Sequence, residues 1–286
     1  MTRVTTPFLS RRGRVDLSVH FSVAFASLAG MVQLVLAVQP DAPLKGVRTL
    51  VSVIALSGLW AIWRSIPRYS VERQFKQSGF SVVVRVGDLF AERADLVIGF
   101  TDTFDTSTER GDIVSPRSVQ GQLLSKVFRG DVTALDSSLL APLRDTPTVA
   151  VESESSKPRG KRVRYPIGTV AAIVHEGRTY YGVAYSRLGN DLVAKSSVDY
   201  LWRGLGNLWT AVAAHGHLEP VAIPIIGSDL AKVSSLGREG LLKMILLSFV
   251  AESRANLISR QFTVVIAPGD ADEVNMLEVQ AFLDTL

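Results

Sequence analysis

Two long apolar stretches dominate the hydropathy pattern of the N-terminal quarter of the chain. Residues 17–40 contain no Asp, Glu, Lys or Arg, and residues 49–63 form a shorter uncharged run between two arginines. A helix needs about 20 apolar residues to cross a bilayer core, so the second run spans only if these arginines extend toward the headgroups. The pattern predicts a transmembrane helical hairpin over residues 17–66, with helices at about 17–38 and 47–66.

The turn between the two stretches and the charges around them predict the orientation of the hairpin. Pro40, Pro43 and Gly46 interrupt the helical pattern and indicate a tight turn. By the positive-inside rule, flanks rich in Lys and Arg stay in the cytoplasm. We therefore expect residues 1–16 and the C-terminal domain to be cytoplasmic; a pair of core helices and a cleaved signal peptide are the alternatives. The flanking basic residues are Arg3, Arg11, Arg12, Arg14, Arg64, Arg68, Arg73 and Lys76.

The remaining two thirds of the chain alternates short β-branched runs with amphipathic stretches. Several runs are apolar on both faces, as expected for strands covered by helices on either side. This alternation predicts one α/β domain over residues 80–286, a three-layer α/β/α sandwich, joined to the hairpin by a linker at 67–79. The predicted strands are Ser81–Val86, Asp95–Phe100, Thr169–Val174, Tyr180–Tyr185, Val221–Ile225 and Phe262–Ala267, and the predicted helices are Ser118–Phe128, Ser197–His215, Leu236–Arg254 and Asp272–Leu286.

Two polar segments within this domain have simple local interpretations. Ser196, three residues before Asp199, resembles the N-cap of the second predicted helix, at 197–215. Residues 152–164 (ESESSKPRGKRVR) show no apolar period. We therefore expect them to form an exposed loop.

The charge distribution argues against nucleic acid as a partner. The net charge is +4, but residues 1–80 carry 10 basic and 3 acidic side chains, whereas residues 81–286 carry 21 basic and 24 acidic. A nucleic-acid-binding domain places its excess positive charge on the folded domain. Here the folded domain is slightly acidic, so nucleic acid is not expected as a partner.

The chain has no cysteine, which excludes disulfides, thiolate metal sites and cysteine nucleophiles. Its four histidines have no ligand-like spacing with carboxylates, so neither a metal nor a cofactor is expected.

Three loops that follow predicted strands are candidates for ligand binding. Ligands of open α/β sheets bind beyond the carboxyl ends of the strands. Gly87-Asp88-Leu89 follows the first strand, residues 101–105 follow the second and lead to residues 112–122, and residues 226–230 follow the strand that ends at Ile225. Small residues in such loops let the backbone approach a phosphate closely, and helix N-termini attract it. Two loops of this kind that face each other would hold a pyrophosphate.

Taken in order, these segments resemble a macro domain over about residues 80–270. The matching motifs are V-G-D-L (86–89), D-L-V-I-G-F-T-D-T-F-D (95–105), S-x-x-S-V-Q-G (115–121) and A-I-P-I-I-G-S-D-L (222–230). With the hairpin in front, the chain resembles the membrane-anchored macro-domain effectors of type II Thoeris anti-phage systems. The stretches Y-P-I-G-T-V-A (165–171) and Y-G-V-A-Y-S (181–186) are similar to the same subgroup.

The resemblance implies a function in anti-phage defence. Macro domains bind ADP-ribose and its derivatives, and in such systems a TIR-domain partner makes a nucleotide second messenger from NAD. For the type II branch this signal is a histidine–ADP-ribose conjugate. Its binding would trigger homo-oligomerisation and disruption of the inner membrane, which leads to abortive infection.

The resemblance also assigns roles to individual residues. Asp88, with Gly87 and Leu89, matches the adenine site, and Thr101–Phe104 matches the segment that lines the distal ribose. By charge alone, Asp102 and Asp105 would meet a cationic group of the ligand. The expected ligand-binding residues are Gly87, Asp88, Leu89, Thr101, Asp102, Thr103, Phe104, the first phosphate loop Ser115, Arg117, Ser118, Val119, Gln120, Gly121 and Gln122, and the second phosphate loop Ile226, Gly227, Ser228, Asp229 and Leu230.

The chain departs from the hydrolytic members of the macro-domain class. Those members carry an asparagine pair after the second strand and a glycine run in the first phosphate loop. Here these places hold Thr101–Phe104 and Ser115–Val119, so the groups that activate water are missing. We expect a binding sensor without catalytic residues; a membrane-tethered ADP-ribosylhydrolase and an ADP-ribose-binding adaptor are the alternatives.

Overall fold

The computed structural model describes residues 11–44, 46–64, 69–228, 233 and 235–286. The chain divides into two compact units, residues 1–68 and residues 69–286. Each unit is described by itself.

The first unit is a hairpin of two antiparallel helices, α1 (Arg11–Val38) and α2 (Val47–Arg64). Small side chains are buried where the helices pack: Ala24 on α1, and Ser57 and Ala61 on α2. Small residues allow two helices in a membrane to approach closely. The remaining large apolar side chains of the hairpin are mostly exposed. Both Leu17–Val38 and Val47–Arg64 are long and apolar enough to cross a membrane, so the predicted helices are present; residues 65–66 of the second lie outside the described residues.

The second unit is built on a mixed sheet with the strand order β1-β2-β10-β9-β3-β7-β6, in which β8 pairs with β7. Strands β2, β10, β9, β3 and β7 are mutually parallel, and the edge strands β1 and β6 are antiparallel to their neighbours. The strands are β1 (Ser70–Phe75), β2 (Phe80–Val86), β3 (Asp95–Thr101), β6 (Val170–His175), β7 (Arg178–Leu188), β8 (Ala194–Lys195), β9 (Val221–Pro224) and β10 (Gln261–Ile266). A separate ribbon pairs β4 (Ala150–Val151) with β5 (Val163–Arg164).

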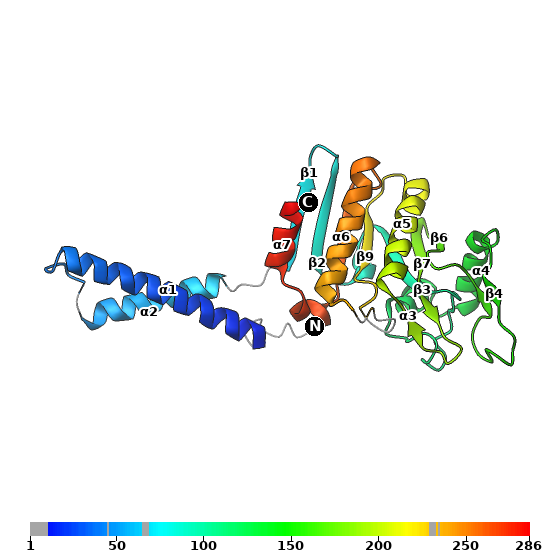
Figure 1. The fold of residues 1–286 in the computed structure, drawn as a ribbon, viewed down its shortest axis with the longest axis horizontal. Coiled ribbons are helices and arrows are strands. Elements are labelled where there is room, and N and C mark those ends of the chain that lie inside the picture. Colours follow the sequence, from blue (N-terminus) through cyan, green and yellow to red (C-terminus); the bar gives the residue numbers. More distant parts are fainter. Residues whose placement is uncertain (1–10, 45, 65–68, 229–232, 234) are drawn as a thin grey trace. The chain divides into compact units, whose positions relative to one another are not determined.

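Two hydrophobic cores cover the two faces of this sheet. On β3, Val97 enters one core while Leu96 and Ile98 enter the other, as strand alternation requires. The first core packs against the helices that lie in front of the strands in Figure 1, and the second packs against the helices of the other face. The front helices are α5 (Val198–His215), α6 (Arg238–Ala255) and α7 (Met276–Thr285), and the others are α3 (Val119–Gln122), which continues as a π-helical turn at Leu123–Val127, and α4 (Val132–Leu143). The predicted three-layer sandwich is confirmed.

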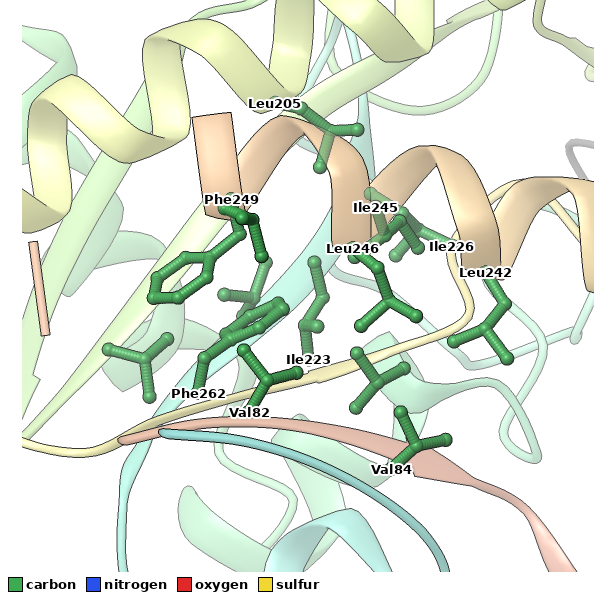
Figure 2. Close-up of a cluster of buried hydrophobic side chains, with 14 of the residues drawn as sticks. Val82, Val84, Leu205, Ile223, Ile226, Leu242, Ile245, Leu246, Phe249 and Phe262 are labelled. Carbon is green, nitrogen blue, oxygen red and sulfur yellow. The ribbon is translucent and has the colours of Figure 1, made fainter. Parts of the chain in front are cut away.

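The front core is closely interlocked between the parallel strands and α6. The rings of Phe249 and Phe262 stack with centroids 4.1 Å apart, and Trp209 meets Phe249 edge to face at 5.2 Å. Figure 2 shows Val82 and Ile223 from two of the strands facing side chains of α6. This rigid layer fixes where the carboxyl ends of β9 and β10 lie.

All six predicted strands and all four predicted helices are present, but several elements were not predicted. Residues 70–75, inside the predicted linker, form the edge strand β1, because alternate residues such as Val71 and Phe75 are buried against α7 and β2. Helix α4 and the short strands β4, β5 and β8 were also missed. The N-cap of α5 is Ser197, which accepts a hydrogen bond from Tyr200 N (3.1 Å); Ser196 instead donates to the carbonyl of Tyr185 (2.6 Å).

Candidate ligand-binding site

A cavity of about 290 Å³ lies at the carboxyl ends of the parallel strands. Strands β3, β7, β9 and β10 all contribute to its wall, which is where ligands of parallel sheets bind. Ten of the predicted residues line it: Thr101, Ser115, Arg117, Ser118, Val119, Gln120, Gln122, Ile226, Gly227 and Ser228. The structure therefore brings the two predicted phosphate loops together, although they are separated by about a hundred residues in the sequence.

A bulge between β3 and β7 shapes one wall of the cavity. Thr101 pairs with Ser186, so Tyr185 is an additional residue on β7. A β carbon built on Gly99 would lie 2.6 Å from the ring of Tyr185, so only glycine lets this ring pack across β3. Gly99, Thr101, Tyr185 and Ser186 all line the cavity.

The first phosphate loop is a tight turn held by its own serines. The Ser118 hydroxyl donates to the carbonyl of Ser115 (2.7 Å) and accepts from Gly121 N (3.1 Å), which caps α3. A β carbon on Gly121 would lie 2.3 Å from the carbonyl oxygen of Ser115. Gly121 does not line the cavity; its role is to let Ser115 and Pro116 pack against the first turn of the helix. Arg117 adds an exposed positive charge to the cavity wall.

The second phosphate loop turns sharply at Gly227, whose φ of +85° is strained for any residue with a side chain. The Ser228 hydroxyl donates to the carbonyl of Ile225 (2.8 Å), and the amide of Val233 donates to the carbonyl of Gly227 (2.9 Å). Ile225 to Ser228 line the cavity. The predicted contacts Asp229 and Leu230 lie outside the described residues.

The structure adds a charged wall that sequence analysis missed. Arg238, the first residue of α6, lines the cavity together with Asp270. The Arg238 guanidinium contacts Asp270 (Nη2–Oδ1, 3.1 Å) and Glu273 (Nε–Oε2, 2.8 Å). Asp270 follows the predicted strand at 262–267, so the same strand-end rule that selected the other loops would have selected it.

Asp88 and its neighbours lie beside this cavity's wall rather than in it. Asp88 caps a 3₁₀ turn at Leu89–Ala91 by accepting from Phe90 N (3.0 Å), and it pairs with Lys126 Nζ at 2.8 Å. The hydrogen bond from Lys126 holds the pKa of Asp88 below its usual value. Leu89 is buried, and Gly87 donates its amide to the carbonyl of Ile266 (2.9 Å). None of the predicted adenine-site residues lines the cavity.

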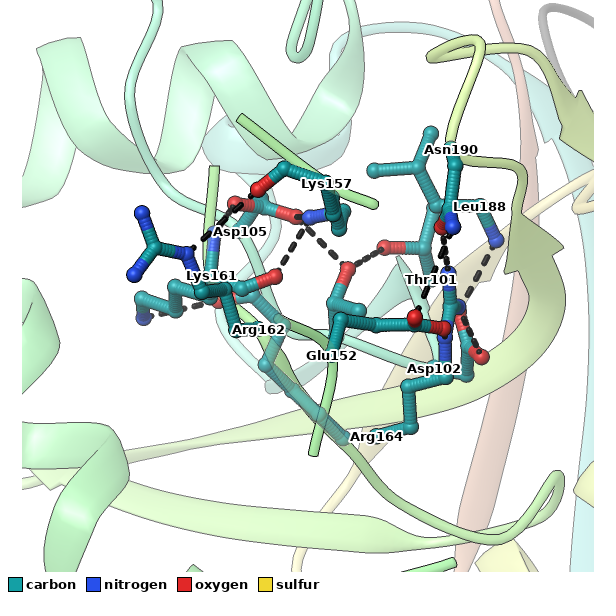
Figure 3. A network of polar contacts seen from close by, with 12 residues as sticks. Thr101, Asp102, Asp105, Glu152, Lys157, Lys161, Arg162, Arg164, Leu188 and Asn190 are labelled. Atoms are coloured by element: carbon teal, nitrogen blue, oxygen red, sulfur yellow. Dashed lines mark hydrogen bonds and ion pairs between the residues drawn. The ribbon is translucent and has the colours of Figure 1, made fainter. Parts of the chain in front are cut away.

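Asp102 and Asp105 belong to a buried ion-pair network (Figure 3). Asp102 accepts from Arg164 Nη1 (2.7 Å) and from Leu188 N (2.8 Å). Asp105 pairs with the fully buried Lys157 (3.3 Å). Both carboxylates are under 5% exposed and neither lines the cavity. Their charges are compensated inside the protein, so the expectation that they meet a cationic group of the ligand is not supported.

The same network corrects part of the prediction of an exposed loop at 152–164, in which residues 153–156, 158 and 160 are exposed. Lys157 and Arg164 enter the protein from this segment and are 0% and 3% exposed. Buried charges are tolerated when they are paired, so two acidic residues after β3 pull the polar segment inward. Thr103 donates to Asp105 (2.6 Å), and Phe104 stacks on Phe100 with centroids 5.3 Å apart. These two predicted contacts are also buried packing residues.

Within the part of the chain that the structure describes, no three His, Cys, Asp or Glu side chains converge as a metal site would require. Of the two arginines that line the cavity, Arg238 is paired with Asp270 and Glu273, whereas Arg117 adds an exposed positive charge.

Comparison with known proteins assigns this arrangement to a family. The family described as "Thoeris protein ThsA, Macro domain" matches residues 82–267, and no curated protein matches. A mutant of the Oceanobacillus iheyensis macrodomain is similar in structure, with 11% identity, a TM-score of 0.51 and coverage of 77% of this chain and 100% of that chain.

Two other structures of the same Oceanobacillus iheyensis macrodomain are also similar. The macrodomain with ADP has 10% identity, a TM-score of 0.48 and coverage of 76% of this chain and 98% of that one. A mutant with ADPR has 11% identity, a TM-score of 0.49 and coverage of 75% and 99%. Because the family match covers residues 82–267, more than half of the chain, this chain belongs to the Thoeris ThsA macro-domain family.

Proposed function

We propose that this chain is a membrane-anchored sensor whose macro domain binds an ADP-ribose-derived signal in the cytoplasm. The observation that carries the proposal is the cavity between the loops Ser115–Gln122 and Ile225–Ser228. Loops of this kind present backbone N–H groups and small side chains to a phosphate. Arg117 supplies a positive charge on the same wall. A nucleoside diphosphate sugar matches this combination of donors and charge.

Membership of the Thoeris family supports a defence context for this binding. In the proposed pathway, a TIR-domain partner consumes NAD during infection and releases histidine–ADP-ribose. The macro domain then binds this second messenger. Replacement of the hydrolytic motifs by Thr101–Phe104 and Ser115–Val119 supports a sensor rather than an enzyme, because the groups that would activate water are not at these positions.

The hairpin is the proposed effector element. Its two helices are long and apolar enough to span the inner membrane, and we place both of their outer ends in the cytoplasm because of the basic flanks. Two helices cannot enclose a pore, so several chains must associate to disrupt the membrane. The ligand can shift the equilibrium between separate and assembled chains only if it binds the two states with different affinities. Membrane disruption then ends growth of the infected cell.

Calorimetry of the full chain in lipid nanodiscs tests the binding step. We expect histidine–ADP-ribose to bind with micromolar or better affinity and plain ADP-ribose to bind more weakly. Gly227→Ala should weaken binding, because a side chain at this φ strains the second phosphate loop. Gly206→Ala is the matched control, since Gly206 lies in α5 with open space around it.

Dye-loaded liposomes that contain the full chain test the effector step. We expect histidine–ADP-ribose to release the dye and Gly227→Ala to require more ligand. Absence of binding by the wild-type chain to either compound would refute the proposal. Conversion of the ligand to products without dye release would instead identify a membrane-tethered hydrolase, and binding without release would identify an adaptor.

A further inference from the structure

The wall formed by Arg238 and Asp270 is distinct in charge from the rest of the cavity. Arg238 contacts two carboxylates from the turn that follows β10, while its side chain is only 18% exposed. Asp270 is 31% exposed and lines the cavity, whereas Glu273 is 59% exposed and does not. Arginine is a donor only, and its planar fork fixes the orientation of a carboxylate that it contacts. Asp270 is thus an acceptor held in position at the edge of the site.

The strand order places this acceptor relative to the phosphate loops. Along the sheet, β10 is next to β9, and β9 is next to β3. All three are parallel, so their carboxyl ends lie along one edge, with neighbouring strands about 5 Å apart. Ser228 follows β9 and the first phosphate loop follows β3. The end of β10 therefore flanks the diphosphate position on one side, and the end of β7 flanks it on the other.

The two flanks differ in chemistry. The β7 side is polar: it contains Ser186, whose hydroxyl donates to the carbonyl of Phe100 (3.4 Å), and the paired Thr101 at the end of β3. The β10 side presents the apolar Val265 and Ala267 beside the guanidinium of Arg238, which can stack on an aromatic ring. In a nucleoside diphosphate sugar, a ribose is attached at each end of the diphosphate, and only one of these riboses carries the base. The apolar flank with the arginine fits the nucleoside end.

We propose that Asp270, positioned by Arg238, recognises the vicinal hydroxyls of the nucleoside ribose. An ionised carboxylate accepts hydrogen bonds and does not donate them, and the two adjacent ribose hydroxyls are donors. Hydrogen bonds to charged groups are the stronger class. This assignment rests on the proposed function and adds a specificity-determining residue to it. With two carboxylates around one arginine, the wall also repels a phosphate at the ribose 2′ position.

Calorimetry with two compounds and three proteins tests this contact in the full chain in nanodiscs. The compounds are ADP-ribose and its analogue that lacks the 2′-hydroxyl of the adenosine ribose. The proteins are the wild type, Asp270→Ala and Asp284→Ala. Asp284, on α7, is the matched control because it forms a surface ion pair with Arg73 of β1 (3.2 Å) and does not line the cavity.

We expect the wild type to bind the deoxy analogue roughly tenfold to a hundredfold more weakly than ADP-ribose. Asp270→Ala should bind ADP-ribose more weakly by a similar factor, and it should distinguish the two compounds by less than about twofold. Asp284→Ala should behave like the wild type. Thermal unfolding of the ligand-free variants checks that all three are folded.

The outcomes separate this inference from the proposed function. If the wild type binds neither compound, the proposed function itself is wrong. If the wild type binds both compounds equally, or if Asp270→Ala still discriminates between them as the wild type does, Asp270 does not contact the nucleoside ribose.

Discussion

Arg164→Met is predicted to be among the most destabilising substitutions in the macro domain that leave the hydrophobic cores intact. Arg164 donates to Asp102 (2.7 Å), to Glu152 (2.6 Å) and to Asn190 (2.7 Å), and it is 3% exposed. Methionine keeps most of the aliphatic side chain but removes all three charge-assisted donors. Among the described residues, the amide of Leu188 on β7 would then be the remaining donor to the buried carboxylate of Asp102.

The expected magnitude follows from the burial of both partners. Breaking a buried ion pair by removing one partner costs about 3–5 kcal/mol. For a domain of 150–250 residues, each kcal/mol lowers the melting temperature by about 2–4 °C. The predicted decrease is therefore about 6–20 °C. Burying the pair also costs free energy, because both charges are removed from water. The double variant Asp102→Asn with Arg164→Met should therefore recover part of the stability that Arg164→Met loses.

Thermal unfolding of the full chain in nanodiscs, followed by the fluorescence to which the buried Trp209 contributes, measures this effect. The matched control is Arg203→Met, which breaks the exposed pair with Asp199 on α5 (59% and 70% exposed). An exposed pair of this spacing contributes about 0.3–0.5 kcal/mol, so its melting temperature should change by less than about 2 °C. If Arg164→Met loses no more stability than Arg203→Met, the reasoning about the buried network is refuted.

Three further predictions follow from single contacts. Gly121→Ala should lower stability by about 1–3 kcal/mol and weaken ADP-ribose binding, because its β carbon displaces Ser115; calorimetry that shows unchanged affinity would contradict this. Burial raises the pKa of Asp95, so the folded state holds its proton to higher pH than the unfolded state and ionisation costs stability as pH rises. Asp95→Asn should therefore gain stability relative to wild type as the pH rises above about 3.8, the ordinary pKa of this carboxyl, and a pH-independent difference in urea unfolding would be inconsistent with this. Lys126→Gln should raise the pKa of Asp88 toward its usual value in an NMR titration; an unchanged midpoint would mean that Lys126 is not its cause.

Local sequence patterns were sufficient for most of the secondary structure. The strands β3 and β10 carry apolar residues on both faces, and a pattern of this kind depends only on neighbours in the chain. The pattern failed at β1, where polar and charged residues alternate with the buried Val71 and Phe75 because the strand lies at the edge of the sheet. It also failed at two positions within residues 152–164, where Lys157 and Arg164 are buried against partners elsewhere in the sequence.

The candidate site was predictable to the extent that it depends on strand ends. The predicted second phosphate loop directly follows the apolar strand β9, and the predicted first one lies on the connection from the apolar strand β3 to the next helix. The roles of the acidic residues were not predictable, because an aspartate after a strand has the same local signature whether it faces a ligand or an internal cation. Asp102 and Asp105 are compensated by Arg164 and Lys157, which lie 62 and 52 residues further along the chain.

The sequence by itself determined the apolar hairpin, the α/β class of the domain and the loops that meet at its ligand-binding edge, because hydrophobic periodicity and turn residues act over a few neighbouring positions. Only the tertiary structure decided which carboxylates are enclosed and which one, Asp270, reaches the cavity wall. The physical reason is that the free energy of a charged group depends on its burial and on its partners, and both are set by the order of the strands in the sheet.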